Sequence, residues 1–258
     1  MTTVFNVNEA TFAYGDKTVI DHLSAKIEAG RFYGIIGPNG CGKSTLVDLL
    51  TGHRRPLRGT VSYLGKPLGR YPKSRVARKI ALVPQNFYIN FPFTAREVVM
   101  MGRYPHMPRF SAPSPADIQR VEQIMAETRT DTLADRYVNE LSGGERQRVV
   151  FTRALAQDAS VLMLDEATSN LDVNHTLLLL NLAARRVKQG KTVIAVFQDI
   201  NLAALYCDHL IFMAAGQVAV SGPVDRVLTP ETLEWVFQVA AKVEFDDYCN
   251  AKQVVFRK

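Results

Sequence analysis

The sequence predicts an α/β protein with a parallel sheet and a helical lobe inserted into it. Three continuous apolar runs are typical of strands buried on both faces, at residues 32–36, 161–164 and 193–197. Apolar residues recur at helical spacing over residues 44–50 and 173–189. Strands that alternate with helices indicate a parallel sheet, and no internal repeat interrupts the pattern.

The two ends of the chain add β-structure and one more helix. Residues 4–14 alternate roughly between apolar and polar positions, which predicts a strand that Gly15 and Asp16 end. A second strand pattern covers residues 20–27. Near the other end, residues 230–237 predict a capped helix and residues 253–256 a short strand.

The inserted lobe is expected between about residue 86 and residue 158. Prolines punctuate the first part of this stretch, and helical patterns cover residues 95–101, 115–128 and 144–157. The expected organisation is a single domain, 1–258, made of a core, 1–85 and 159–258, and the lobe, 86–158.

Composition limits the class of protein. The 258 residues carry 31 Lys+Arg against 25 Asp+Glu, a net charge of +6, with 47% hydrophobic residues, which is the balance of a folded soluble protein. This charge is an ordinary solvated surface, although charge alone leaves nucleic acid or an anionic membrane face open. Cys41, Cys207 and Cys249 stand far apart without a CxxC pair, which argues against a zinc site and favours the reducing cytoplasm.

The sequence shows no targeting or membrane segment. The amino terminus lacks a basic patch followed by an apolar stretch, so we expect no signal peptide. The most apolar region, residues 192–220, is interrupted by polar residues and falls short of the roughly 18 apolar residues of a membrane span. We therefore expect that this chain does not cross a bilayer by itself.

A glycine-rich loop between a predicted strand and a predicted helix is the most specific motif. Residues 37–44 match G-x-x-x-x-G-K-[ST] at every fixed position. Glycines let the backbone point N–H groups at phosphate oxygens, and the following helix adds the positive end of its dipole. Lys43 is expected to reach the β- and γ-phosphates, Ser44 to hold Mg²⁺, and Cys41 to act as a small filler. The expected nucleotide-binding residues here are Gly37, Pro38, Asn39, Gly40, Cys41, Gly42, Lys43, Ser44 and Thr45.

Two acidic residues follow the buried strand at 161–164. Adjacent side chains of a strand point to opposite sides, so Asp165 and Glu166 are expected to have different roles. Asp165 suits the Mg²⁺ shell, and Glu166 suits polarisation of the water that attacks the γ-phosphate. A strand that merely ends in acidic turn residues is the alternative, and the phosphate loop makes it the less common one.

Residues 141–148, LSGGERQR, decide the family. Ser142, Gly143 and Gly144 precede a predicted helix, so they form a second helix start suited to an anion. One nucleotide does not need both the phosphate loop at residues 37–44 and this second anion site. The second site is therefore expected to bind the nucleotide of a partner chain. Here the sequence closely resembles the ATP-binding cassette (ABC) family, whose signature is LSGGQ, with Glu145 where glutamine is common.

The resemblance covers essentially the whole chain and implies both fold and activity. It implies a phosphate-loop NTPase cassette with a RecA-like core, an N-terminal antiparallel β-subdomain and an inserted α-helical subdomain. It implies an ATPase that binds ATP and Mg²⁺ and works as a homodimer with two composite sites.

The resemblance also implies roles for individual residues. Tyr14 resembles the aromatic residue that stacks on adenine, although a plain strand aromatic is the alternative. Gln85 resembles the glutamine that contacts Mg²⁺ and the lytic water, and Asp172 the key acid of the loop where two subunits meet. The family places a histidine that bonds the γ-phosphate where this sequence has Gln198. An amide donates a hydrogen bond but never becomes cationic, so we expect slower hydrolysis with binding largely kept.

Within the family the chain looks most like the ATPase subunit of a bacterial importer. It lacks the coiled coils or zinc modules of DNA-repair cassettes, the second cassette common in ribosome-acting ones, and the membrane helices often fused in exporters. The resemblance implies a peripheral protein at the cytoplasmic face of the bacterial inner membrane. The implied partners are two transmembrane permease subunits and, indirectly, an extracytoplasmic solute-binding protein, with no nucleic acid.

A narrower resemblance comes from the string GRYPH at residues 102–106. It is familiar in ATPases that serve iron-siderophore, haem and cobalamin uptake, and residues 133–136 and 199–203 have the same likeness. A Pro-ordered surface turn is the alternative interpretation. The implied function is uptake of one of these solutes; the rival hypotheses are a cassette acting on nucleic acid or the ribosome, or import of an unrelated solute.

Aromatic residues gather in the first part of the predicted lobe, and they suit docking of a short cytoplasmic helix from a membrane subunit. A buried aromatic cluster within the lobe is the competing explanation. These residues are Phe87, Tyr88, Phe91, Phe93 and Tyr104.

Overall fold

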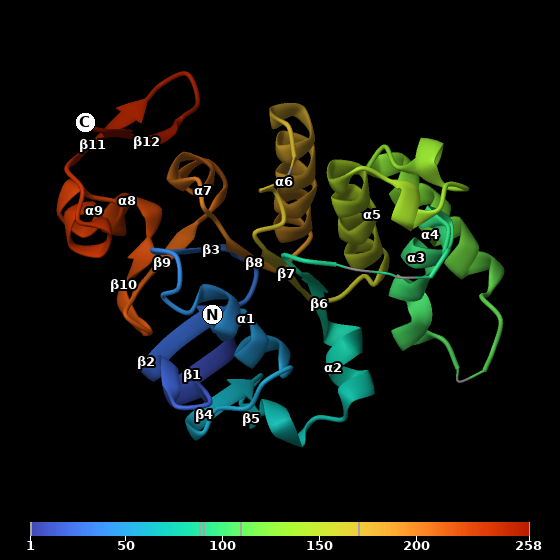
Figure 1. Ribbon diagram of the computed structural model, residues 1–258, viewed down its shortest axis with the longest axis horizontal. Helices are drawn as coiled ribbons and strands as arrows, with labels where there is room; N and C mark the ends of the chain where they lie inside the picture. Colours follow the sequence, from blue (N-terminus) through green and yellow to red (C-terminus); the bar gives the residue numbers. More distant parts are fainter. Residues whose placement is uncertain (1, 88, 90, 109, 170, 258) are drawn as a thin grey trace. The chain divides into compact units, whose positions relative to one another are not determined.

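The computed structural model has the α/β fold that the sequence predicts (Figure 1). It forms two compact units: the first is Met1–Tyr71 with Val187–Lys258, and the second is Pro72–Arg186. None of the helices among the described residues has both the length and the apolar character needed to span a membrane. The described residues are 2–87, 89, 91–108, 110–169 and 171–257.

A parallel sheet lies at the centre of the first unit. Its strands run in the order β9 (His209–Ala214), β3 (Phe32–Ile36) and β8 (Thr192–Val196), and β10 (Gln217–Pro223) adds an antiparallel edge to β9. Every residue of β3 and β8 is buried, as their continuous apolar sequences predict. The helix α1 (Lys43–Thr51) follows β3 after a loop.

The N-terminal residues form an antiparallel sheet in the same unit. Its order is β2–β1–β4–β5. Gly59 has φ 75°, and a Cβ there would lie 2.1 Å from the carbonyl oxygen of Glu9, so this close approach of β4 to β1 requires glycine. The strands are β1 (Thr3–Tyr14), β2 (Lys17–Glu28), β4 (Arg58–Tyr63) and β5 (Lys66–Pro67), followed by the 3₁₀ helix η1 (Leu68–Arg70).

The C-terminal residues complete the first unit with three helices and a hairpin. The helix predicted at 230–237 is confirmed, and the Thr229 side chain caps it by accepting from the Thr232 N–H. The predicted last strand is one half of a hairpin, and the other half, whose residues are all partly or fully exposed, was not predicted. These elements are α7 (Ile200–Tyr206), α8 (Val224–Val227), α9 (Pro230–Phe237), β11 (Ala241–Asp246) and β12 (Ala251–Phe256).

The second unit combines two parallel strands with a group of helices. The neighbouring helices α3, α4 and α5 lie side by side around a buried cluster that includes Val98, Val121 and Val149 (Figure 1). Thr94 and Ser114 begin α3 and α4 with capping boxes. The elements are α2 (Lys73–Lys79), β6 (Ile80–Val83), α3 (Ala95–Met100), η2 (Met101–His106), α4 (Pro115–Glu127), η3 (Asp131–Leu133), η4 (Val138–Glu140), α5 (Gly143–Ala156), β7 (Val161–Asp165) and α6 (Val173–Lys188).

The string at residues 102–106 forms η2 and ties it to the end of α5. A Cβ at Gly102 would lie 2.2 Å from the carbonyl oxygen of Arg153, so only glycine allows this contact. Arg103 donates to Asp117 and to the Ala156 carbonyl, at 2.9 Å each, and His106 lies 2.7 Å from the Gln157 carbonyl. Through these contacts residues 102–106 pack against α4 and the end of α5, so they are more than an exposed turn.

We predict that Arg103→Met destabilises the protein by about 2 kcal/mol, because it removes the donor to Asp117 Oδ1 and to the Ala156 carbonyl, while Ser114 still donates to Asp117 Oδ2. The Arg103 and Asp117 side chains are only 16% and 13% exposed. The matched control is Arg96→Met, since Arg96 is 42% exposed and its pairs with Glu122 and Asp135 lie in solvent, where they are worth about 0.5 kcal/mol. Urea unfolding followed by circular dichroism measures both, and equal losses would contradict the prediction.

Candidate functional site

The glycine-rich loop joins β3 to α1 in a conformation that other residues do not allow. A Cβ at Gly37 would lie 2.2 Å from the carbonyl oxygen of Met213, and Gly42 has φ 104° with Ile20 2.7 Å from its Cβ position. Gly42 begins α1, and no side chain of the described residues caps this helix. The loop therefore presents backbone and a helix start, which is the arrangement that binds phosphate groups.

Lys43 places a positive charge inside this loop. Its Nζ donates to the carbonyl oxygens of Gly37 and Pro38 at 2.8 and 3.0 Å, and the residue is 6% exposed. Burial raises the pKa of the neighbouring Cys41 thiol, so Cys41 is uncharged at neutral pH. The loop offers the Lys43 ammonium and its backbone N–H groups as donors. These groups fit a polyanion such as a chain of phosphates.

Tyr14 ends β1 with an accessible ring. The side chain is 44% exposed, the guanidinium of Arg54 lies 5.4 Å from its ring centroid, and Phe12 meets it edge to face at 5.0 Å. These neighbours fix the ring while part of it stays open to a planar base. The sequence did not indicate that Arg54 contacts the Tyr14 ring, because the two residues are far apart in the chain and only the folded structure brings them together.

The sheet brings Gln198 to the edge that carries the glycine loop. Ile35 pairs with Val196 in parallel register, and the loop and Gln198 each begin two residues later. Because the carboxyl ends of parallel strands meet at one edge, both lie at this edge of the first unit. Gln198 is exposed, and the next residue, Asp199, caps α7 by accepting from the N–H groups of Asn201 and Leu202.

In the second unit the ends of β6 and β7 bring Gln85 and Glu166 together. Gln85 Nε2 donates to Glu166 Oε2 at 2.6 Å. Asp165 and Glu166 are both 8% exposed, but Asp165 ends β7 whereas Glu166 lies beyond it with φ 50°. The backbone therefore makes a left-handed turn at Glu166, so the two adjacent carboxylates are attached to different local conformations.

The residues Ser142, Gly143 and Gly144 form the start of α5. Ser142 is the N-cap, and its N–H and hydroxyl donate to Glu145 Oε2 at 2.9 and 2.8 Å. These bonds, with a smaller contribution from Arg136, lower the pKa of Glu145. Among the described atoms none lies within 4 Å of a Cβ built at Gly143, so the backbone there is open to a partner.

Asp172 lies directly before α6, and the first turn of that helix places His175 next to its carboxylate. Asp172 Oδ1 accepts from the His175 N–H at 2.8 Å, and both carboxylate oxygens lie 2.9 Å from His175 Nδ1. These contacts lower the pKa of Asp172, so it is ionised at neutral pH. The D-x-x-H spacing is the sequence signal that would have found His175. Asn170, in the same predicted loop, lies outside the described residues.

The aromatic residues of the lobe divide into two groups. Phe91 and Phe93 are 69% and 36% exposed, with ring centroids 6.3 Å apart, and Tyr104 is 57% exposed. Phe87 packs against the buried cluster of the second unit, and the Arg153 guanidinium lies 4.3 Å from its ring centroid. Tyr88 lies outside the described residues. The exposed rings are available to a partner, whereas Phe87 is part of the fold.

Comparison with known proteins agrees with these arrangements. A family model described as ABC transporter matches residues 20–169. The chain is 41% identical to the cobalamin import ATP-binding protein BtuD of Halobacterium salinarum, over 92% of this chain and 59% of that protein. It therefore spans less than two thirds of the length of that relative.

Other relatives match over most of their length. The chain is 37% identical to the hemin import ATP-binding protein HmuV of Thermobifida fusca, over 94% of this chain and 84% of that protein. It is also 37% identical to the ferric enterobactin transport ATP-binding protein FepC of Escherichia coli, over 96% and 92%. A chain of an ABC transporter solved in an inward-facing conformation is 27% identical, with a TM-score of 0.84 over 100% of this chain and 98% of that one.

The capping box of α5 leads to a stability prediction. Glu145→Ala should lower the free energy of unfolding by about 1 kcal/mol, whereas Glu145→Gln, which keeps both acceptor bonds, should stay within about 0.5 kcal/mol of the original chain. Because the folded pKa of Glu145 is lowered, its contribution is complete at neutral pH and is lost in acid, as the pH falls through that pKa. Urea unfolding at neutral and acidic pH tests this, and a Gln variant as weak as the Ala variant would refute it.

Proposed function

Because the chain belongs to the ABC transporter family, we propose that it is the subunit of an importer that binds and hydrolyses ATP. The observation that carries the proposal is the loop at residues 37–44, where glycine-dependent backbone and the Lys43 ammonium form a cradle for phosphates. The relatives BtuD, HmuV and FepC, which are named as ATP-binding proteins of import or transport systems, support the same function.

In this proposal ATP binds along the edge of the first unit. The loop N–H groups and Lys43 hold the phosphates, and the exposed ring of Tyr14 stacks on adenine. Gln198 donates its amide to the γ-phosphate from the end of β8. Ser44, Asp165 and Gln85 offer the hydroxyl, carboxylate and amide oxygens that Mg²⁺ prefers, and the ion would neutralise phosphate charge.

Hydrolysis is assigned to Glu166. Its carboxylate accepts a hydrogen bond from Gln85, so one oxygen is held in place, and a nearly buried carboxylate is a strong acceptor for a water proton. The water attacks the γ-phosphorus, the bond to the leaving oxygen of ADP breaks, and the water proton passes toward Glu166.

The second nucleotide contact is assigned to a partner copy of the chain. The helix start formed by Ser142, Gly143 and Gly144, open at Gly143, suits the γ-phosphate of ATP bound to the partner's loop, and Glu145 stabilises it through the capping box. Asp172, held ionised by His175, suits the contact between the two copies. The functional unit is thus a head-to-tail homodimer with two ATP molecules.

The membrane partners are assigned to the exposed aromatic residues of the second unit. Phe91, Phe93 and Tyr104 suit a short cytoplasmic helix of each of two permease subunits, which would hold this chain peripherally at the cytoplasmic face of the cell membrane. An extracytoplasmic solute-binding protein would act indirectly. The relatives support cobalamin, haem or a ferric siderophore as the solute.

Glu166→Gln should lower ATP turnover by about 100-fold or more while ATP binding persists, because the amide no longer accepts the water proton. ATP should then accumulate a closed dimer, visible by size-exclusion chromatography with light scattering. Glu140→Gln, which changes an exposed carboxylate of the same unit, is the matched control and should leave turnover unchanged. Undiminished turnover without closed dimers would exclude this role for Glu166.

Gln198→His should raise turnover by about three- to tenfold with the KM for ATP nearly unchanged, because an imidazole donates the same bond and can also carry charge. The variant should also gain a pH dependence around the histidine pKa of about 6.5, which the original chain lacks at this position. Steady-state phosphate release between pH 6 and 8 measures both effects. The absence of any gain would show that Gln198 does not limit the rate.

A further inference from the structure

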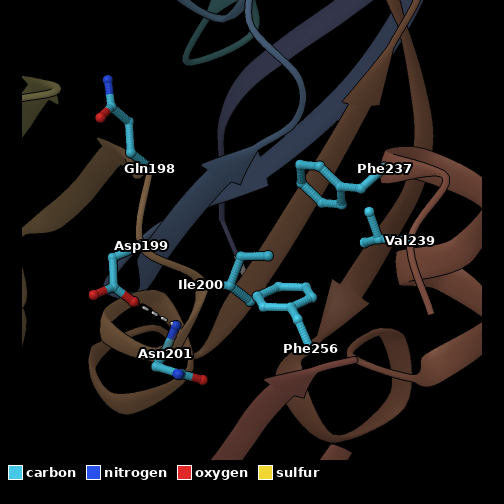
Figure 2. Close-up of a pocket in the computed structure, with 7 residues that line it drawn as sticks. All are labelled: Gln198, Asp199, Ile200, Asn201, Phe237, Val239 and Phe256. Carbon is cyan, nitrogen blue, oxygen red and sulfur yellow. Dashed lines mark hydrogen bonds between the residues drawn. The ribbon is translucent and has the colours of Figure 1, made fainter. Parts of the chain in front are cut away.

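A pocket beside the loop after β8 is lined by residues that, apart from Gln198, have no role in the proposed function. Its volume is about 530 Å³, and its walls come from three separate parts of the first unit (Figure 2). Residues 198–201 form one wall, Phe237 ends α9 with Val239 just beyond it, and Phe256 ends β12. This volume lies within the range of small-molecule sites, roughly 300–1,000 Å³.

The lining has a polar side and an apolar side. In Figure 2, Gln198 and Asp199 lie on one side, Phe237, Val239 and Phe256 lie on the other, and Ile200 lies between them. Among these described lining residues none is basic, and Asp199 is the one with a carboxylate. A carboxylate attracts a cation, and so do the faces of phenylalanine rings. The chemistry therefore favours a ligand with a positive group and an apolar body.

The walls of the pocket are fixed to one another. The amide of Asn201 accepts from the Val254 N–H at 2.7 Å and donates to the Val254 carbonyl at 3.3 Å, which joins α7 to β12. Val254 is 4% exposed, and both bonds are partly buried. Asp199 in turn fixes the start of α7. A site with walls held in this way is formed before any ligand arrives, which lowers the entropic cost of binding.

We propose that this pocket binds a small organic cation with an apolar body. The Asp199 carboxylate would attract the positive group, and the Phe237 and Phe256 rings would contact the apolar body. This binding does not depend on the proposed function.

Binding is tested with the full chain and two matched probes. One is 2-phenylethylamine, a cation at neutral pH, and the other is 2-phenylethanol, which has the same ring and length without the charge. Asp199→Asn removes the charge but keeps a residue that caps helices well. It should weaken binding of the amine by about fivefold and leave the alcohol nearly unchanged, measured by chemical-shift titration. Glu234→Gln, an exposed carboxylate of α9 outside the pocket, is the control.

The apolar side is tested in the same titration. Phe256→Ala should weaken both probes by about threefold or more, because it removes a ring from the wall. Phe245→Ala removes another exposed ring of the same hairpin outside the pocket and should change neither. The site is refuted if neither probe binds, if Asp199→Asn binds the amine as well as the original chain, or if the two phenylalanine variants behave alike.

Discussion

The close approach of Gly37 to β9 is the contact on which the candidate site depends. With the Met213 carbonyl oxygen 2.2 Å from where a Cβ would be, any other residue would push the loop away from the sheet. Because Gly37 can lie there, the chain turns sharply after β3, Lys43 reaches back to the Gly37 carbonyl, and α1 starts without a side-chain cap. A site for phosphates is thus a consequence of how tightly a loop packs on a sheet.

In both units, neighbouring parallel strands place the candidate site residues just beyond their carboxyl ends. Parallel strands end at one edge, so residues just beyond neighbouring strands come together even when they are far apart in sequence. In the first unit this brings Gln198 to the edge of the glycine loop, and in the second it brings Gln85 within hydrogen-bond distance of Glu166. Strand pairing therefore supplies the placement, and the residues beyond the strands supply the chemistry.

Features that depend on burial and on local motifs could be predicted from the sequence. The buried strands β3, β7 and β8 were predicted because their sequences are continuously apolar, and the fold class followed from them. Strand β11 was missed although its sequence alternates between apolar and charged residues; none of its six residues is buried, so no packing against the core distinguishes it. The positive φ of Glu166 and the bonds between Asn201 and Val254 depend on tertiary contacts, which no local pattern contains.

Helix α5 connects the two regions of the second unit that are proposed to contact other chains. Its first residues are Ser142 to Glu145, and its last turn is fastened to η2 by Gly102, Arg103 and His106. A helix of 14 residues is about 21 Å long and resists bending. It should therefore move as a rigid body. A small tilt of the end near Tyr104 would tilt Ser142, Gly143 and Gly144 at the other end by a similar angle.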